Sequence, residues 1–157
     1  MAQQLWLLRH GEAEPHGTRP DPERELTPRG RDQSRAAGRA LAALGVEIHV
    51  ALTSPKVRAR ETARIACAVL DVDLAEHDAL AEGFDSREAL ALLGAAGADQ
   101  RVLVVGHEPD FSEVVEDLTG ARIDLKKGGV AAVRLDGTRG ELVALLRPRE
   151  LDRIGAA

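Results

Sequence analysis

The chain has 157 residues and a formal net charge of −5, because 26 aspartates and glutamates outnumber 21 lysines and arginines. Only 2% of the residues are aromatic, so a nucleic-acid-binding protein, which needs stacking surfaces and a basic balance, is not expected. Charged residues make up 30% of the chain, and no apolar run approaches the ~20 residues that span a bilayer, which argues against a membrane protein.

The length fits a single domain over residues 1–157. One cysteine, Cys67, leaves no basis for a disulfide framework or a cysteine zinc site, and its apolar helical neighbours predict a packed, inert thiol. A strand-like run begins almost at the first residue and leaves no room for a signal peptide. We therefore expect a cytoplasmic protein that is a monomer or a simple oligomer.

The first elements are predicted from apolar runs and helix signals. Residues 5–8 form a short apolar run that predicts a buried strand. Residues 14–28 contain four prolines and many charges, which predicts an exposed loop. Thr27 is expected to cap a helix over residues 28–44, and Gly45 is expected to end it.

The remaining segments continue the alternation of strands and helices. Ser86 and Asp110 are expected to cap two of the helices, and residues 136–140 predict a glycine-bearing hairpin loop. Strands are predicted over residues 48–52, 74–76, 101–106, 130–135 and 142–146, and helices over residues 56–70, 86–93 and 110–118.

This alternation predicts an α/β fold. We expect a three-layer sandwich with a mostly parallel central sheet, helices on both faces and a C-terminal β-hairpin. Such sheets bind ligands at the carboxyl ends of their strands. Three polar segments directly follow predicted strands, so chain order alone brings them to one edge of the sheet. They are Arg9-His10-Gly11, residues 54–58 and Gly106-His107.

The residue types in these segments suit a phosphoryl group. Arg9 and Arg58 supply fork-like donors that match phosphate oxygens. His10 and His107 can supply a nucleophilic nitrogen and a further cationic donor. Glycine at position 11 allows close approach of a ligand to the backbone. Taken singly, Arg58 could be an exposed helical arginine and His107 a structural histidine; their joint occurrence favours a phosphoryl pocket.

Four segments carry a resemblance to a known family. The sequence resembles the histidine phosphatase superfamily, which has the phosphoglycerate mutase-like fold. Gly83-Phe84-Asp85 and the Lys126–Gly129 run are more similar to the SixA-type phosphohistidine phosphatases. The four segments are residues 8–13, 26–30, 54–63 and 105–109.

The resemblance implies roles for the candidate residues. His10 would be the nucleophile that becomes transiently phosphorylated, while Arg9, Arg58 and His107 would bind the transferred phosphoryl group. The resemblance implies neither a metal nor another cofactor. Activity is expected to fall in acid as His10 protonates.

The general acid is the uncertain element of the resemblance. Many members of the superfamily use a carboxylic acid to protonate an alkoxide leaving group, and Glu82 is the candidate by position. Asp85 and Glu12 are weaker candidates, and a solvated loop glutamate is the alternative reading of Glu82. SixA-type members are described as lacking this acid. Imidazole leaves more readily than an alkoxide, so a phosphohistidine substrate needs the acid less.

Several charged residues have two readings. The loop residues His16, Arg19, Asp21 and Arg24 could contact the leaving group, although a solvated loop is favoured. Lys126 and Lys127 could line the pocket entrance or be solvated.

The leading hypothesis is a metal-independent phosphohistidine phosphatase that acts on a phosphorylated protein. The alternatives are a phosphatase for a small phosphate ester and a non-catalytic phosphate-binding regulatory domain. A metallohydrolase is disfavoured because no His-x-x-x-His or paired-carboxylate motif accompanies the histidines. A mutase is disfavoured by the short chain.

Overall fold

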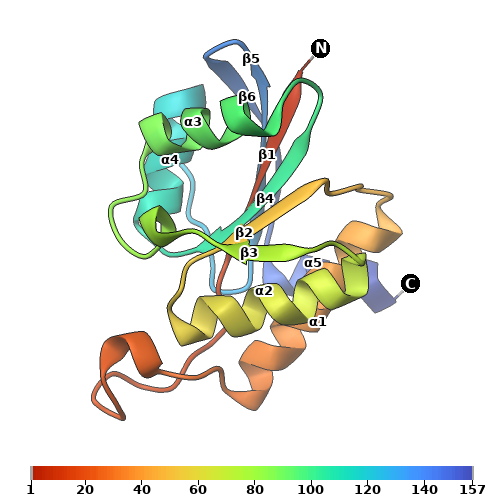
Figure 1. Cartoon of the computed structure of the whole chain (residues 1–157). Coiled ribbons are helices and arrows are strands. Elements are labelled where there is room, and N and C mark those ends of the chain that lie inside the picture. The colour runs from red at the N-terminus through yellow and green to blue at the C-terminus, as the bar shows by residue number, and fades with distance from the viewer. Residues whose placement is uncertain (1, 157) are drawn as a thin grey trace.

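The computed structural model describes residues 2–156, and its centre is a six-stranded sheet with the order β3-β2-β4-β1-β5-β6 (Figure 1). The strands are β1 (Gln3–Arg9), β2 (Val50–Thr53), β3 (Leu74–Glu76), β4 (Arg101–Gly106), β5 (Val130–Asp136) and β6 (Arg139–Leu146). The helices are α1 (Pro28–Ala43), α2 (Val57–Leu70), α3 (Ser86–Ala96), α4 (Asp110–Thr119) and α5 (Pro148–Ala156). Two short 3₁₀ turns, Asp21–Glu23 and Asp78–Leu80, lie in the loops.

Parallel pairing dominates the sheet. β1 pairs in parallel with β4, and β2 pairs in parallel with both β4 and β3. β5 runs antiparallel to β1 and forms the C-terminal hairpin with β6. The predicted α/β fold with its closing hairpin is therefore confirmed.

Side chains of β1 alternate between two cores. Leu5 and Leu7 pack on the face covered by α3 and α4, whereas Trp6 and Leu8 pack on the face covered by α1, α2 and α5 (Figure 1). A strand buried on both faces needs an unbroken apolar run, which explains the composition of residues 5–8. Within residues 2–156, no helix has both the length and the apolar character required to cross a membrane.

Helix caps show where local prediction succeeds. The Thr27 hydroxyl accepts a hydrogen bond from the Gly30 amide at 3.1 Å, as predicted. The predicted Ser86 cap is wrong, because the preceding Asp85 accepts from the Glu88 amide at 2.9 Å. Asp110 is the first residue of α4 rather than its cap, and its carboxylate accepts from the Gly83 amide at 3.0 Å.

Helix α5 was not predicted. It has nine residues, and Leu151 is its only fully buried apolar side chain within the described range, so its periodic signal is weak. The available signals were Pro148 at the first helical position and Glu150, which accepts from the Arg147 amide at 2.8 Å. The helix packs against α1, where Gly155 meets the backbone of Ala36.

Candidate active site

Adjacent carboxyl ends of β1, β4 and β2 bring the predicted site residues together. The His10 amide donates to the Gly106 carbonyl at 3.0 Å, and the Ser54 amide donates to the Val105 carbonyl at 2.9 Å. The imidazole centroids of His10 and His107 lie 5.3 Å apart. Four predicted residues line one cavity of about 170 Å³, namely Arg9, His10, Arg58 and His107.

His10 presents one free ring nitrogen. Its Nδ1 lies 2.7 Å from the Gly11 carbonyl, which can only accept, so Nδ1 carries the proton and Nε2 keeps its lone pair. Burial lowers the pKa of His10 to about 3, and the charges of Arg58 and Arg9 add to this effect against the opposing Gly11 hydrogen bond. The imidazole is therefore neutral at pH 7. The predicted fall of activity in acid should occur at a pH below the range in which an ordinary histidine titrates.

His107 is also neutral in the free protein. Its Nε2 lies 2.8 Å from the Ser54 hydroxyl, and its buried Nδ1 has no hydrogen-bond partner within residues 2–156. Burial lowers its pKa to about 3, and neighbouring His10 and Arg58 lower it further. The expected role of His107 as a cationic donor therefore requires a bound anion, which would raise this pKa.

Unpartnered donors concentrate at the cavity. The Nε atoms of Arg9 and Arg58 are buried without a partner in the described part of the chain, as is Nδ1 of His107. The fourth such side-chain atom is Nε2 of His77. Leaving a buried donor unsatisfied costs roughly 1–3 kcal/mol, so the two guanidinium Nε–H groups suit an anion with several acceptor oxygens, and Nδ1 of His107 adds a third donor whenever it carries a proton.

Arg58 is held by Asp21, which lines the same cavity. Its Nη1 donates to the Asp21 carbonyl at 2.8 Å, and its Nη2 donates to Oδ2 of the same residue at 3.2 Å. Burial would raise the pKa of Asp21, yet the hydrogen bond from Arg24 and the charge of Arg58 lower it well below its ordinary value. Asp21 therefore stays ionised and orients Arg58.

The proline-rich loop is a wall of the cavity rather than a solvated excursion. His16, Asp21 and Arg24 line the cavity, and Arg24 is 7% exposed. Arg19 does not line it and instead binds Glu14 at 2.8 Å. A bridge between Ala13 and Leu26 and a hydrogen bond from the Glu14 amide to the Glu25 carbonyl (2.8 Å) close the neck of the loop. The signal in the sequence for this ordered wall is the three-residue spacing of Asp21 and Arg24, which allows an ion pair, in a segment that contains prolines.

Glycine at position 11 has a packing role that the sequence analysis missed. A Cβ atom there would come within 2.5 Å of the Gly30 carbonyl oxygen, and a Cβ at Gly30 would clash with the Glu12 carbonyl. Glycine at position 11 therefore allows a close approach between the β1 end and α1. The signal for this contact in the sequence is the Thr27-Pro28-Arg29-Gly30 segment that starts α1.

None of the three predicted acids lines the cavity. The Glu82 side chain is 86% exposed and lies 3.5 Å from Lys56 Nζ, in a separate shallow depression. Asp85 caps α3, and Glu12 lies 3.8 Å from Arg29. The carboxylates that do line the cavity are Asp21 and Glu108, and the latter accepts from the Ser112 amide at 2.7 Å.

The part of the chain between residues 2 and 156 holds no group of three or more His, Cys, Asp or Glu side chains arranged to bind a metal ion. Cys67 is buried in the core, and burial raises the pKa of its thiol to about 11, which leaves it unreactive.

Comparisons with known proteins find one family model, a relative of similar length and several solved structures that resemble this chain. The family model described as the histidine phosphatase superfamily (branch 1) matches residues 5–91. An uncharacterized protein of Picosynechococcus sp. is 32% identical over 94% of this chain and 98% of its own. The protein histidine phosphatase SixA complexed with tungstate superposes with a TM-score of 0.86 and 28% identity, covering 94% of this chain and 99% of that one. A putative phosphohistidine phosphatase SixA from Nakamurella multipartitia gives 0.81 and 27%, covering 94% and 97%.

Burial of two neutral histidines predicts an acid-labile fold. Each pKa is lowered to about 3 from an ordinary 6.5, so unfolding takes up protons and stability is lost as pH falls from 6.5 toward 3. Replacing His10 or His107 by Gln should reduce the slope of unfolding free energy by about 1.4 kcal/mol per pH unit between about pH 4 and 6. Urea unfolding at several pH values measures this. His16→Gln is the control because its side chain is 86% exposed; equal slopes in all variants would contradict the assignment.

Asp21 should matter for stability more than an exposed aspartate with the same spacing. Asp21 and Asp32 each bind an arginine three residues later at 2.8 Å. Asp21 binds the buried Arg24 and Arg58, whereas Arg35, the partner of Asp32, is exposed. Asp21→Asn is expected to lower the free energy of unfolding by about 1–2 kcal/mol, and Asp32→Asn by less than about 0.5 kcal/mol. Urea denaturation at pH 7 compares the two; a loss of the same size in both would count against an ordered loop wall.

Proposed function

The chain belongs to the histidine phosphatase superfamily and is a phosphatase, and from this premise we propose that its substrate is phosphohistidine carried by a phosphorylated protein. His10 is the nucleophile of this reaction. Arg9, Arg58 and His107 bind the transferred phosphoryl group. The reaction needs no metal and no other cofactor.

In the first step, the Nε2 lone pair of His10 attacks phosphorus. The N–P bond of the substrate breaks, and the leaving imidazole keeps the bonding pair and takes a proton from solvent. The Gly11 carbonyl, 2.7 Å from Nδ1, stabilises the positive ring that carries the phosphoryl group. Water then attacks phosphorus, the Nε2–P bond breaks with its electron pair returning to His10, and inorganic phosphate leaves while the proton lost by water passes to solvent.

Charge stabilisation falls to fixed donors around the cavity. The transition state spreads negative charge over three equatorial oxygens, and preorganised cations stabilise it without moving. The unpartnered donors of Arg9, Arg58 and His107 match this demand in number and kind. Phosphate binding also raises the pKa of His107, which turns it into a stronger donor.

The observation that carries the choice of substrate is the position of Glu82 outside the cavity. An alkoxide leaving group would need a protonated acid, whereas Asp21 is ionised and bound to arginines, and both carboxylate oxygens of Glu108 accept hydrogen bonds from Ser112. An imidazole leaving group makes a smaller demand. The similar structures named as the protein histidine phosphatase SixA and as a putative phosphohistidine phosphatase SixA support the same substrate. A small phosphate ester is therefore the weaker alternative, and a non-catalytic domain would have no use for a His10 held as a neutral tautomer.

Removing the nucleophile should abolish turnover and the intermediate together. We expect wild type to release phosphate from a phosphohistidine peptide, and to do so much faster than from any simple alkyl phosphate. His10→Ala should lower kcat/KM by at least about 10³-fold, and Arg58→Gln by about 10²–10³-fold. Rapid quench with labelled peptide should trap an alkali-stable, acid-labile phosphoenzyme in wild type and none in His10→Ala. His49→Ala, away from the cavity, is the control; turnover that survives in His10→Ala would exclude this mechanism.

Glu82 should be dispensable for the N–P substrate. Because its side chain is exposed and paired with Lys56, Glu82→Gln is expected to change kcat/KM for a phosphohistidine peptide by less than about threefold. Any residual activity on phosphate esters should also change by less than about threefold, because Glu82 lies outside the cavity and cannot protonate a leaving group there. Steady-state assays with both substrates measure this; a tenfold or larger loss on phosphohistidine would make Glu82 the acid after all.

A further inference from the structure

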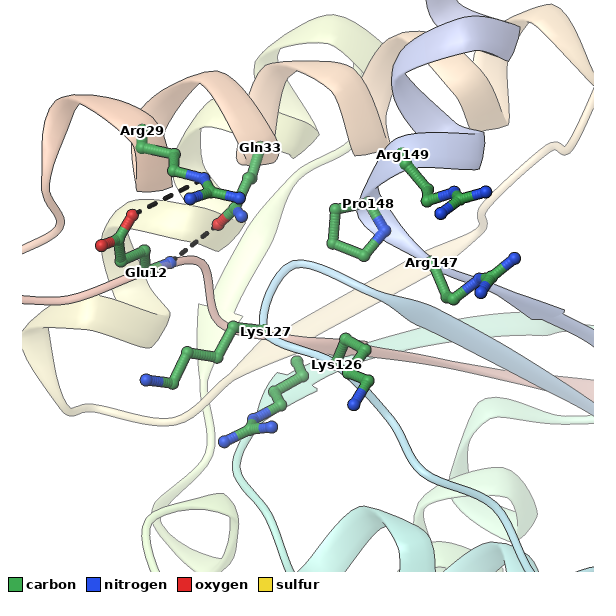
Figure 2. A pocket seen from close by; sticks show the side chains of 9 residues that line it. Glu12, Arg29, Gln33, Lys126, Lys127, Arg147, Pro148 and Arg149 are labelled. Atoms are coloured by element: carbon green, nitrogen blue, oxygen red, sulfur yellow. Dashed lines mark hydrogen bonds and ion pairs between the residues drawn. The ribbon is translucent and has the colours of Figure 1, made fainter.

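A second, larger recess of about 570 Å³ opens beside the phosphoryl cavity (Figure 2). It shares Arg9 and Lys127 with that cavity, so the two are adjacent. We call it the basic groove, and its other lining residues are Glu12, Arg29, Gln33, Lys126, Arg147, Pro148 and Arg149.

The charge of the basic groove is opposite to that of the chain. Its lining has six lysines and arginines and one carboxylate, Glu12, which gives 6 − 1 = +5, whereas the whole chain carries −5. Three of the cations have carboxylate partners: Arg29 with Glu12 at 3.8 Å, Lys126 with Asp124 at 2.7 Å and Arg147 with Glu150 at 2.9 Å. Lys127 and Arg149 have no ion-pair partner among residues 2–156. The groove therefore keeps an excess of positive charge.

Backbone contacts hold the basic groove at the nucleophile. The Gly128 amide donates to the His10 carbonyl at 2.9 Å, which ties the lysine pair to the end of β1. Val130 of β5 lies opposite Leu146 of β6, so the Lys126–Gly129 run and Arg147 are neighbours at one end of the hairpin. Lys127 also lowers the pKa of His10 through its charge. An anion bound in the groove therefore lies next to the reacting phosphoryl group.

We propose that the basic groove binds an acidic segment of the phosphoprotein substrate, next to its phosphohistidine; this inference rests on the proposed function. Figure 2 shows the cationic side chains on three separate segments around an open space: Arg29 on α1, Lys126 and Lys127 before β5, and Arg147 and Arg149 at the start of α5. A second phosphate would need donors that converge on one point. Cations spread along a recess suit carboxylates spaced along a chain.

The test uses two synthetic phosphohistidine peptides that differ only in flanking residues. One has aspartates and glutamates on both sides of the phosphohistidine, and the other has glutamine and serine there. Wild type should prefer the acidic peptide by about tenfold in kcat/KM, through KM, and the preference should vanish near 1 M salt because exposed charges are screened. Equal rates on the two peptides would overturn the proposal.

Charge reversal tests whether the preference comes from the basic groove. Lys126→Glu with Arg149→Glu should raise KM for the acidic peptide about tenfold and leave kcat and the neutral peptide within about twofold. Glutamate at position 149 lies in the first turn of α5, where a negative charge is tolerated, so the fold should persist. The control is Arg134→Glu with Arg139→Glu, at the far end of the hairpin, which changes the net charge equally. Equal effects of the two pairs would indicate general steering and reject the groove.

A binding measurement without turnover separates failure of the proposed function from failure of the basic-groove proposal. Anisotropy with the unphosphorylated acidic peptide should show salt-sensitive binding to wild type and to the control pair, but not to the groove variant. If phosphohistidine turnover is absent but this pattern holds, the function is wrong and the groove stands. No binding of the acidic peptide, or its displacement by pyrophosphate at far lower concentration than by an acidic competitor, would reject an acidic protein segment as the ligand.

Discussion

The parallel pairing of β1 with β4 is the constraint on which the whole site depends. Its register sets Arg9 opposite Gly106, so the residues that follow, His10 and His107, leave the sheet side by side. A slip of one residue would turn Leu5 and Leu7 toward the wrong core and separate the two imidazoles. Packing of the two cores therefore enforces the distance between groups that the chemistry requires, and stability and reactivity share one cause.

Electrostatic balance in the cavity follows from burial as much as from charge. Two arginines lie close to two histidines. Burial keeps both rings neutral in the free protein, because a protonated ring would be a buried positive charge beside guanidinium groups. Asp21 makes the arrangement possible, because its carboxylate lies 3.2 Å from Arg58 Nη2 and offsets the charge of that guanidinium group. The cavity thus keeps a positive charge that attracts an anion, while ion pairs and hydrogen bonds hold its side chains in position.

Most of the framework could be predicted from the sequence because its signals are local. Apolar runs such as residues 5–8, the Thr27–Pro28 helix start and residues placed after strands each report a short-range preference. The rest depends on distant partners. Whether Asp21 is solvated depends on Arg58, 37 positions away, and the use of Asp85 instead of Ser86 as a cap depends on the path of the preceding turn. The exposure of Glu82 and the neutral state of His107 likewise arise only from the folded surroundings.

The closed neck of the proline-rich loop has a consequence for how this scaffold can diversify. Ala13 and Leu26 are bridged, and the Thr27 amide donates to the Glu12 carbonyl at 3.0 Å, so the two stems of the loop meet before the helix begins. Apart from Asp21 and Arg24, which hold Arg58 and the wall of the cavity, the intervening stretch is free to vary because its two ends are already joined. Its length and composition can change to admit different leaving groups, while the Gly11–Gly30 contact beneath it keeps the nucleophile in register with α1. A single architecture could in this way acquire new substrates by grafting one segment.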